Sequence, residues 1–322
     1  MKILVYCLTI VLGTGATTAT AVENGTLATG DSYVVSVVNF DLSGACSGVL
    51  VSPSVVITAT HCVLDKNGLI SKTIYVGTPG QSNKTAVSKT NSVVQVVTSD
   101  SYNSNAASVT DNDLAFLVLS NQLPMAISKM VHLASEAETA KLKSSKAPLK
   151  FVGYGVTSDT SEESEFPYSF LGTYSTLTNS NYPNSGYINS TMSNSCKGDS
   201  GGPVFYTTPT RITLVGILTG GARSKNCTKK ESDGTYLSLF TETSKYANLA
   251  FEANIYASFN DSMRSKAEYV KDDETIAELR NQVFDLQTEM RNLEKRSAKL
   301  NSCLNSLKKV VGSAGKRIPK GC

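Results

Sequence analysis

Residues 196–204 read Cys-Lys-Gly-Asp-Ser-Gly-Gly-Pro-Val, and this stretch decides how the rest of the chain is interpreted. Glycines stand on both sides of Ser200, where they let the backbone approach a bound molecule closely. Such a turn also lets adjacent N–H groups point at one developing oxyanion. A generic glycine-rich turn is the alternative, but a string of this length and composition is too specific for it.

Short runs of β-branched and other apolar residues fill the sequence between Val22 and Ala257. Clusters of Ser, Thr, Asn and Gly separate these runs, which is the pattern of an all-β barrel or sandwich. The expected strands are residues 34–38, 48–51, 55–58, 93–97, 114–119, 150–152 and 214–218. Residues 243–254 have the apolar spacing of a helix and are expected to close this domain.

Two further segments carry residues suited to proton transfer. His61 follows a strand that is expected to be buried, and it precedes Cys62, which can bridge back to Cys46. A bridge there would hold the imidazole rigidly, as a general base requires. Asp113 enters another buried strand, where a carboxylate needs a partner such as an imidazole. A structural histidine and a strand-start cap, for which Asp111 is the better candidate, are the alternatives.

Taken together, these segments resemble the trypsin- and chymotrypsin-like (S1 family) serine proteases over about residues 22–254. The resemblance rests on the Thr-Ala-Thr-His-Cys string ending at Cys62, on Asp113-Leu-Ala and on Gly-Asp-Ser-Gly-Gly-Pro from Gly198, in the family's order. Lesser landmarks are Gly153-Tyr-Gly, Val215-Gly-Ile and Gly234-Thr-Tyr. The family implies an all-β protein of two six-stranded antiparallel β-barrels with the active site between them, followed by a C-terminal helix. The expected protease domain is residues 22–257.

Carried over residue by residue, the resemblance implies catalytic roles. Ser200 is implied to be the nucleophile, and His61 the general base that later acts as the acid. Asp113 is implied to hold the imidazole in its tautomer and to stabilise the imidazolium. The backbone N–H groups of Gly198 and Ser200 are implied to form the oxyanion hole. The expected reaction is hydrolysis of peptide bonds in a polypeptide substrate through an acyl-enzyme, and no cofactor or metal is expected.

The resemblance also implies two disulfides, Cys46–Cys62 behind the histidine and Cys196–Cys227 beside the specificity pocket. The second histidine of the chain, His132, stands in the apolar, strand-like context Met130-Val-His-Leu and is interpreted as structural.

The first 21 residues have the composition of a cleavable secretory signal. Met1 and Lys2 precede an apolar run, and Ala19-Thr20-Ala21 offers a cleavage site. Removal of this segment takes Cys7 away and leaves six of the seven cysteines, an even set as expected for a secreted, disulfide-bonded protein. The expected location is extracellular or periplasmic.

Cleavage after Ala21 would give the mature chain the N-terminal residue Val22. In the family, a free amino group at this position pairs with the carboxylate just before the nucleophilic serine, so an activation pair of Val22 and Asp199 is implied. No Lys or Arg lies between Lys2 and Val22, so the sequence offers no basic site for activation by another trypsin-like enzyme. The chain is therefore expected to need no propeptide.

The substrate pocket is expected to be uncharged. Asn194 stands at the floor position, where cleavage after Lys or Arg requires Asp, and Ser195 follows it. Gly221 and Gly234 are the expected walls, which leave room for a large side chain. An uncharged floor fits Tyr, Phe, Leu or an amide better than a cation, because an unpaired buried charge is unfavourable. Specificity for Lys or Arg is therefore not expected.

The strand beside the pocket departs from the family. Thr219-Gly220-Gly221 replaces the usual Ser-Trp-Gly, so the aromatic ring is missing, and the Thr219 hydroxyl is expected to donate to Asp113. A third family disulfide, below the pocket, has no matching cysteines.

The sequence after Ala257 differs in composition from the part that is rich in expected strands. Residues 258–273 are polar and are expected to form a linker, and apolar residues from Ile276 to Val311 then recur at alternating spacings of three and four. This pattern indicates a coiled coil over 274–311. β-branched residues at several a positions with Leu at d favour two parallel strands, whereas Glu289 and Glu294 would repel across a parallel homodimer. An antiparallel pair, a different partner helix, a helix folded back on the protease-like part and a solitary amphipathic helix docked there are the alternatives.

The chain is expected to end in a short tail, residues 312–322. Its Cys322 could pair with Cys303, within one chain or between two.

Composition excludes some classes of function. Of the 322 residues, 40% are hydrophobic and 18% are charged, as in ordinary globular proteins. The net charge of +3 is too small to argue for binding to nucleic acid or to a membrane surface. The leading hypothesis is a secreted serine endopeptidase. The alternative is a protease-like binding protein that acts through its coiled coil and whose catalysis is vestigial.

Overall fold

The structure is a computed structural model of the whole chain. It describes residues 22–41, 44–82, 91–102, 111–125, 131–156, 164–176, 182–221, 227–269 and most positions of 282–305. The chain divides into two compact units, Met1–Ser258 and Phe259–Cys322. The predicted signal, residues 1–21, and the predicted tail, residues 312–322, lie outside the described residues.

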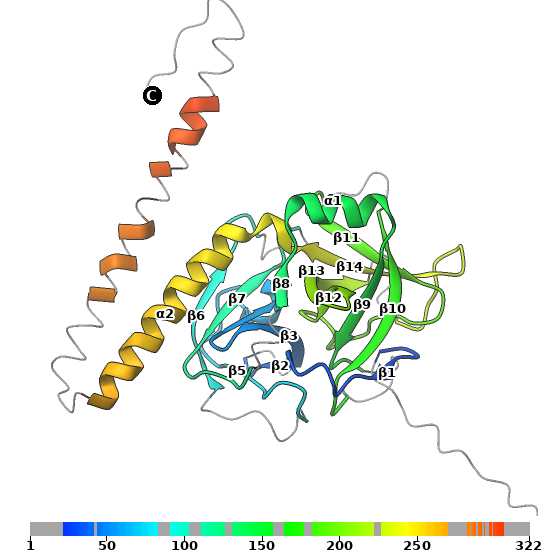
Figure 1. Cartoon of the computed structure of the whole chain (residues 1–322), viewed down its shortest axis with the longest axis horizontal. Coiled ribbons are helices and arrows are strands. Elements are labelled where there is room, and N and C mark those ends of the chain that lie inside the picture. The colour runs from blue at the N-terminus through cyan, green and yellow to red at the C-terminus, as the bar shows by residue number, and fades with distance from the viewer. Residues whose placement is uncertain are drawn as a thin grey trace, which may run out of the picture. The chain divides into compact units, whose positions relative to one another are not determined.

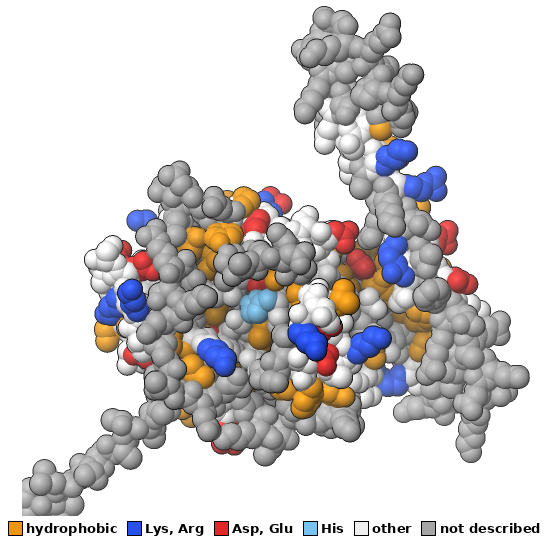
Figure 2. Space-filling view, turned by 180° about the vertical axis from the view of Figure 1, so that it is seen from behind, with side chains coloured by type: hydrophobic (Ala, Val, Ile, Leu, Met, Phe, Trp, Pro, Cys, Tyr) orange, Lys and Arg blue, Asp and Glu red, His pale blue; other side chains and the backbone are white. Residues whose placement is uncertain are grey.

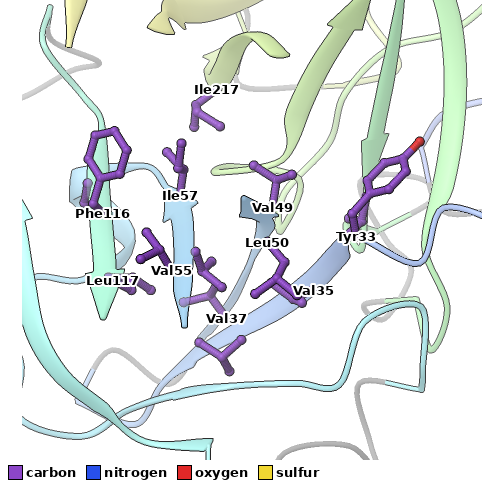
Figure 3. Close-up of a cluster of buried hydrophobic side chains, with 14 of the residues drawn as sticks. Tyr33, Val35, Val37, Val49, Leu50, Val55, Ile57, Phe116, Leu117 and Ile217 are labelled. Atoms are coloured by element: carbon purple, nitrogen blue, oxygen red, sulfur yellow. The ribbon is translucent and has the colours of Figure 1, made fainter. Parts of the chain in front are cut away.

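The first half of the larger unit is a six-stranded antiparallel sheet. Its strands are β2 (Val34–Asn39), β3 (Gly44–Ser52), β4 (Val55–Thr58), β5 (Ile74–Val76), β6 (Val93–Thr98) and β7 (Ala115–Leu119). They pair in the order β5-β2-β3-β4-β7-β6, and a bridge from Tyr75 to Ser92 brings the two edges toward each other. All residues of β4 and β7 are buried, as continuous β-branched and apolar runs predict. Figure 3 shows side chains of these strands turned into one cluster, with Ile217 of the second half above them.

The second half is a closed barrel. Its strands are β9 (Pro148–Gly153), β10 (Tyr168–Ser175), β11 (Ser185–Ser190), β12 (Pro203–Thr208), β13 (Arg211–Gly221) and β14 (Tyr236–Glu242). They pair around the ring in the order β9-β10-β11-β14-β13-β12, and β12 pairs with β9 to close it. Two short strands add to it: β1 (Thr26–Leu27) pairs with β10, and β8 (Val131–Leu133) runs parallel to β13. The two halves lie side by side, blue to cyan and green to yellow in Figure 1, which confirms the expected all-β class.

Helices lie at the margins of the sheets. The turns η1 (Thr60–Cys62) and η4 (Thr243–Lys245) are short, and α1 (Glu136–Ser144) begins with a capping box between Ser135 and Glu138. The C-terminal helix α2 (Ala247–Tyr269) buries Ala253 and Ala257 in the core of the first sheet. The expected C-terminal helix is therefore confirmed, although its regular part begins at Ala247.

Part of the predicted linker, residues 258–273, is helical. Residues 258–269 continue α2, and their role as a linker stays a prediction. They are polar, but they include Met263, Arg264, Lys266 and Ala267, which favour a helix, and they contain no Pro or Gly. In the second unit, all described positions of 282–305 are helical. The predicted coiled coil stays a prediction.

Among the described residues, no helix combines the length and the hydropathy needed to cross a membrane.

Candidate active site

Strand pairing brings His61 and Asp113 together. His61 lies in η1, directly after β4, and Asp113 stands just before β7. β4 and β7 pair antiparallel with Thr58 opposite Ala115, so the end of one strand meets the start of the other. The imidazole Nδ1 lies 2.6 Å from Asp113 Oδ2, and the backbone N–H of His61 donates to Asp113 Oδ1 over 2.9 Å. Two hydrogen bonds therefore hold the carboxylate against the histidine.

The environment of His61 favours a stronger base. Burial by itself lowers the pKa of the imidazole, but the charge of Asp113 and its hydrogen bond act in the opposite direction and raise the pKa above the usual 6.5. The Asp113 side chain is only 2% exposed, whereas that of His61 is 36% exposed. The carboxylate is therefore shielded from water while an edge of the imidazole stays open to a substrate.

The loop 196–202 presents two unused backbone donors. Gly198 and Gly201 have φ values of +89° and +81°, which side chains rarely tolerate. The N–H of Asp199 donates to Cys196 O over 3.1 Å, and that of Gly202 donates to Asp199 O over 2.9 Å. In contrast, the N–H groups of Gly198 and Ser200 donate to none of the residues that the structure describes. These are the two donors that the resemblance implies for an oxyanion hole.

Ser200 lies in this loop next to the segment that carries the histidine. A Cβ on Gly201 would collide with Thr58 Oγ1, so the loop packs directly against the end of β4. Ser200 Oγ makes no hydrogen bond within the described part of the chain, and His61 Nε2 lies 3.7 Å from Cys62 Sγ. The structure thus joins His61 to Asp113 but leaves the serine–histidine hydrogen bond open. Such bonds often tighten only when substrate is bound.

Asp199 is a fully buried carboxylate. Its two oxygens accept from the N–H groups of Gly155 and Cys196, each over 2.8 Å. Burial raises the pKa of the Asp199 carboxyl to about 7, and these two backbone hydrogen bonds oppose the rise. A Cβ on Gly153 or Gly155 would collide with the carboxylate, which explains why glycine stands at both positions.

Val22 is buried close to this carboxylate. Its backbone N donates to Val156 O over 3.2 Å, and Val156 follows the Gly155 that binds Asp199. Val22 is fully buried and its φ is +64°, a strained value for a β-branched residue. Val22 and Asp199 therefore bind two successive residues, Val156 and Gly155, and their pairing stays a prediction.

Both implied disulfides of the larger unit are confirmed, Cys46–Cys62 and Cys196–Cys227. The Cys303–Cys322 pairing stays a prediction, because Cys322 lies outside the described residues. The sulfur atoms of Cys46 and Cys62 and a ring nitrogen of His61 lie within 4.8 Å of one another. They do not form a metal site, because metals bind thiolates and these sulfur atoms share a disulfide.

The predicted pocket floor is a closed, neutral hydrogen-bond network. Asn194 Nδ2 donates to Cys227 O over 2.8 Å, and Ser238 Oγ donates to Asn194 Oδ1 over 3.0 Å. Ser195 Oγ in turn donates to Ser238 Oγ over 2.8 Å. All three side chains are buried, and none carries a charge. Ser238, on β14, completes this network and was missed from the sequence because it lies far from the motif.

The other predicted pocket residues are Gly221, Gly234 and Thr219. Gly221 ends β13 opposite Ser238, and Gly234 has a φ of +82°, with no described neighbour within 4 Å of the place that a Cβ would take. The expected donation from Thr219 to Asp113 is wrong. Thr219 lies at a bulge between Leu218 and Gly220, and its Oγ1 lies 3.1 Å from Thr241 Oγ1 and 3.5 Å from Ile217 O.

Asp111 ties the two halves together and does not cap β7. Its carboxylate accepts from Asn184 Nδ2 over 2.8 Å, from the Asn184 N–H over 3.2 Å and from Ser185 Oγ over 3.3 Å. The next residue, Asn112, has a φ of +64°, and its Oδ1 accepts from Tyr246 OH over 2.8 Å and from Asn184 Nδ2 over 3.2 Å. Asp113 is therefore anchored to both halves through its two predecessors. The Asp-Asn-Asp string could have signalled a polar turn here.

His132 takes no part in these contacts. Its side chain is exposed on β8 and not enclosed in the apolar surroundings that its neighbours predicted. Among the described side chains on the face drawn in Figure 2, those of Lys and Arg are scattered, with Asp and Glu between them.

The family comparison agrees with this geometry. Residues 24–249 match the family model described as Trypsin. The match covers the strands β1 to β14, both confirmed disulfides, and the residues His61, Asp113 and Ser200.

Proposed function

The chain belongs to the trypsin family of serine peptidases, and on this premise we propose that it is a catalytically active, secreted endopeptidase. The observation that carries the proposal is the pair of unused N–H groups at Gly198 and Ser200, close to a histidine that is already bound to Asp113. A binding protein needs neither feature, whereas acyl transfer needs both.

The first half of the reaction forms the acyl-enzyme. Ser200 Oγ attacks the carbonyl carbon of the scissile peptide, and His61 Nε2 takes the hydroxyl proton. The carbonyl oxygen becomes an oxyanion that the N–H groups of Gly198 and Ser200 can bind. The imidazolium, stabilised by Asp113, then gives its proton to the amide nitrogen as the C–N bond breaks, and the amine leaves.

The second half repeats these steps with water. His61 removes a proton from water, the hydroxide attacks the ester carbon, and the same N–H groups bind the new oxyanion. Collapse of this intermediate releases the carboxylic acid and returns the proton to Ser200 Oγ. The raised pKa of His61 suits both roles, because proton transfer is most efficient when the pKa of the base lies near the working pH.

Substrate preference follows from the floor network of Asn194, Ser195 and Ser238. Its groups satisfy one another without a net charge, so a Lys or Arg side chain would be buried there without a counter-ion. We propose that the residue before the scissile bond is uncharged, either apolar and large or an amide. Gly221 and Gly234 would leave the walls open for it.

Activation is proposed to follow signal removal. Release of residues 1–21 would create an ammonium group on Val22, at the segment where Gly155 holds the Asp199 carboxylate. A buried carboxyl whose pKa stands near 7 is stabilised in its charged form by a nearby cation. The two disulfides agree with secretion, since such bonds persist in oxidising compartments.

The predicted coiled coil is proposed to bind another helix. In its described part, Leu286, Leu293 and Leu300 recur every seven residues, and these residues are 56%, 54% and 71% exposed. A helix that exposes such a stripe is stabilised by a second helix. Sedimentation of the full chain tests this proposal. Self-association that is lost in the double variant Leu286→Ala/Leu293→Ala would show that the partner is a second copy of the chain. A chain that stays monomeric at every concentration and binds no other helical protein would contradict the proposal.

A fluorophosphonate probe tests the enzyme proposal, because it reacts with an activated serine. Secreted protein that begins at Val22 should be labelled stoichiometrically, and Ser200→Ala should abolish the labelling. Cleavage of a peptide library should then show uncharged residues before the scissile bond. Absence of labelling in correctly processed, folded protein would favour the vestigial binding protein instead.

A further inference from the structure

Ser47 is a fully buried serine of β3 that contacts the nucleophile loop from the other half of the molecule. Its backbone N–H donates to Ser200 O over 2.8 Å. Its hydroxyl donates to Gly198 O over 3.0 Å. One residue of the first sheet thus binds the carbonyl groups of both residues whose N–H groups form the proposed oxyanion hole.

The same hydroxyl also accepts a hydrogen bond. The N–H of Tyr154 donates to Ser47 Oγ over 2.8 Å, and Tyr154 stands between the two glycines that enclose the Asp199 carboxylate. Ser47 itself is held in place, because its carbonyl accepts from Thr58 Oγ1 over 2.7 Å and its neighbour Cys46 is bonded to Cys62. The hydroxyl therefore links a rigid strand to both segments that shape the loop.

Gly198 needs such an external restraint. With a φ of +89° and no side chain, it can rotate its peptide groups more freely than any other residue type. A rotation would turn its N–H away from the oxyanion, and the three hydrogen bonds inside the loop join Asp199 to Cys196 and Gly202 and do not involve Gly198. Among the described residues, the only side chain that binds the Gly198 carbonyl is Ser47.

We propose that Ser47 is a positioning residue for the oxyanion hole, and that its hydroxyl fixes Gly198 in the conformation that stabilises the transition state. The proposal rests on the proposed peptidase function. It requires that loss of the hydroxyl weaken binding of the oxyanion while binding of uncharged ground-state groups stays as it was. A merely structural role would instead lower the amount of folded protein and leave the kinetics of the folded fraction unchanged.

The test uses Ser47→Ala in the processed full chain, with active sites counted by fluorophosphonate titration so that only competent protein is compared. Removal of a direct oxyanion donor lowers kcat by about 10²–10³-fold, so loss of a residue that orients one donor should lower kcat by about 10- to 100-fold. KM should change less than about twofold. A peptide aldehyde forms a hemiacetal with the nucleophilic serine and places an oxygen in the hole, so its Ki should rise by the same factor as kcat falls.

Controls separate this role from general damage. Ser54→Ala removes another buried serine hydroxyl of the first half of the molecule. Ser54 lies between β3 and β4, at the end of β4 that is opposite Thr58, so this variant should change none of these constants. Ser47→Thr keeps a hydroxyl and should recover most of the lost kcat. A product peptide that ends in an alcohol instead of a carboxylate offers the hole neither an electrophilic carbonyl nor an anionic oxygen, and it should bind Ser47→Ala as it binds the parent chain.

The outcomes are distinguishable. If the parent chain is not labelled by the fluorophosphonate, the peptidase proposal fails, and the Ser47 proposal with it. If the parent is labelled but Ser47→Ala keeps its kcat, or weakens the aldehyde and the product peptide equally, the Ser47 proposal alone is refuted. A parallel loss in kcat and aldehyde affinity, with product affinity unchanged, supports it.

Discussion

Removal of the residues before Val22 should change the pH dependence of stability, because no cation among the described residues pairs with the buried carboxyl of Asp199. Its pKa is about 7 in the fold against 3.8 as an ordinary aspartate. At 1.36 kcal/mol for each pKa step, this difference corresponds to about 4 kcal/mol of unfolding free energy. The carboxyl has no exposed surface, so solvent screening does not reduce this figure.

The sign follows from proton binding. Between pH 3.8 and about 7 the folded, unprocessed chain holds a proton on Asp199 that the unfolded chain has released. Its unfolding free energy therefore falls as the pH rises through this window, and levels off above it. In the processed chain, the Val22 ammonium group is expected to lower the pKa of Asp199. The stability from the pair is then present above the unfolded pKa of Asp199, and it is lost as the amino group deprotonates at high pH.

The assay is urea unfolding of two chains in a Ser200→Ala background, which prevents self-digestion. One chain begins at Val22, and the other keeps Ala19-Thr20-Ala21 before it. The processed chain should be the more stable one, and its advantage should grow by about 3 kcal/mol between about pH 4.5 and about pH 7. In the extended chain, Asp199→Asn should remove the pH dependence. Parallel pH curves for the two chains, or an unchanged slope in Asp199→Asn, would refute the reasoning.

Three further predictions concern the site. The acidic limb of kcat/KM should lie above pH 6.5, because Asp113 raises the pKa of His61, and in Asp113→Asn it should move to lower pH as kcat falls; a limb at the same pH in both proteins would contradict this. Asn112→Gly tolerates the φ of +64° but loses two accepted hydrogen bonds, so it should lower the unfolding free energy by about 2 kcal/mol in denaturant titrations. An unchanged unfolding free energy would show that these two hydrogen bonds do not stabilise the fold. Asn194→Asp should bring cleavage after Lys and Arg into a peptide-library profile at the expense of uncharged residues, and an unaltered profile would show that this side chain does not face the substrate.

Strands with uninterrupted apolar runs could be predicted from the sequence, whereas those with polar alternation could not. β4 and β7 are buried on both faces, and β-branched residues fill β4 while apolar residues fill β7 without a break. β10, β11 and β14 have Ser, Gly, Thr or Asn between their apolar residues, and their pattern resembles that of loops. The capping box at Ser135 was a readable signal for α1.

The residues of the candidate site also fall into two groups, those that the sequence predicts and those that it does not. Motif residues such as His61 and Ser200 stand in strings that are recognisable alone. Ser47 and Ser238 act through partners about 150 and 44 positions away in the chain, and no local pattern announces a hydrogen bond over such a separation. The hydrogen bond expected from Thr219 to Asp113 could not be judged from the sequence for a related reason, since a bulge of one residue changes the side of the strand on which a side chain lies.

The buried polar groups around the nucleophile loop bear on the choice between an enzyme and a vestigial binding protein. A fold that only binds is stabilised by neutral, fully paired groups in its core, and Asp199 is the opposite: a carboxyl that destabilises the unprocessed fold near neutral pH. Its two N–H donors come from backbone that glycines bring within reach, and its shielding from water is complete. Such an arrangement becomes favourable once a cation arrives, and the chain places the amide of Val22 at the neighbouring peptide. We infer that the loop is built to be completed by processing, which gives a reason for the buried charge that a binding role does not supply.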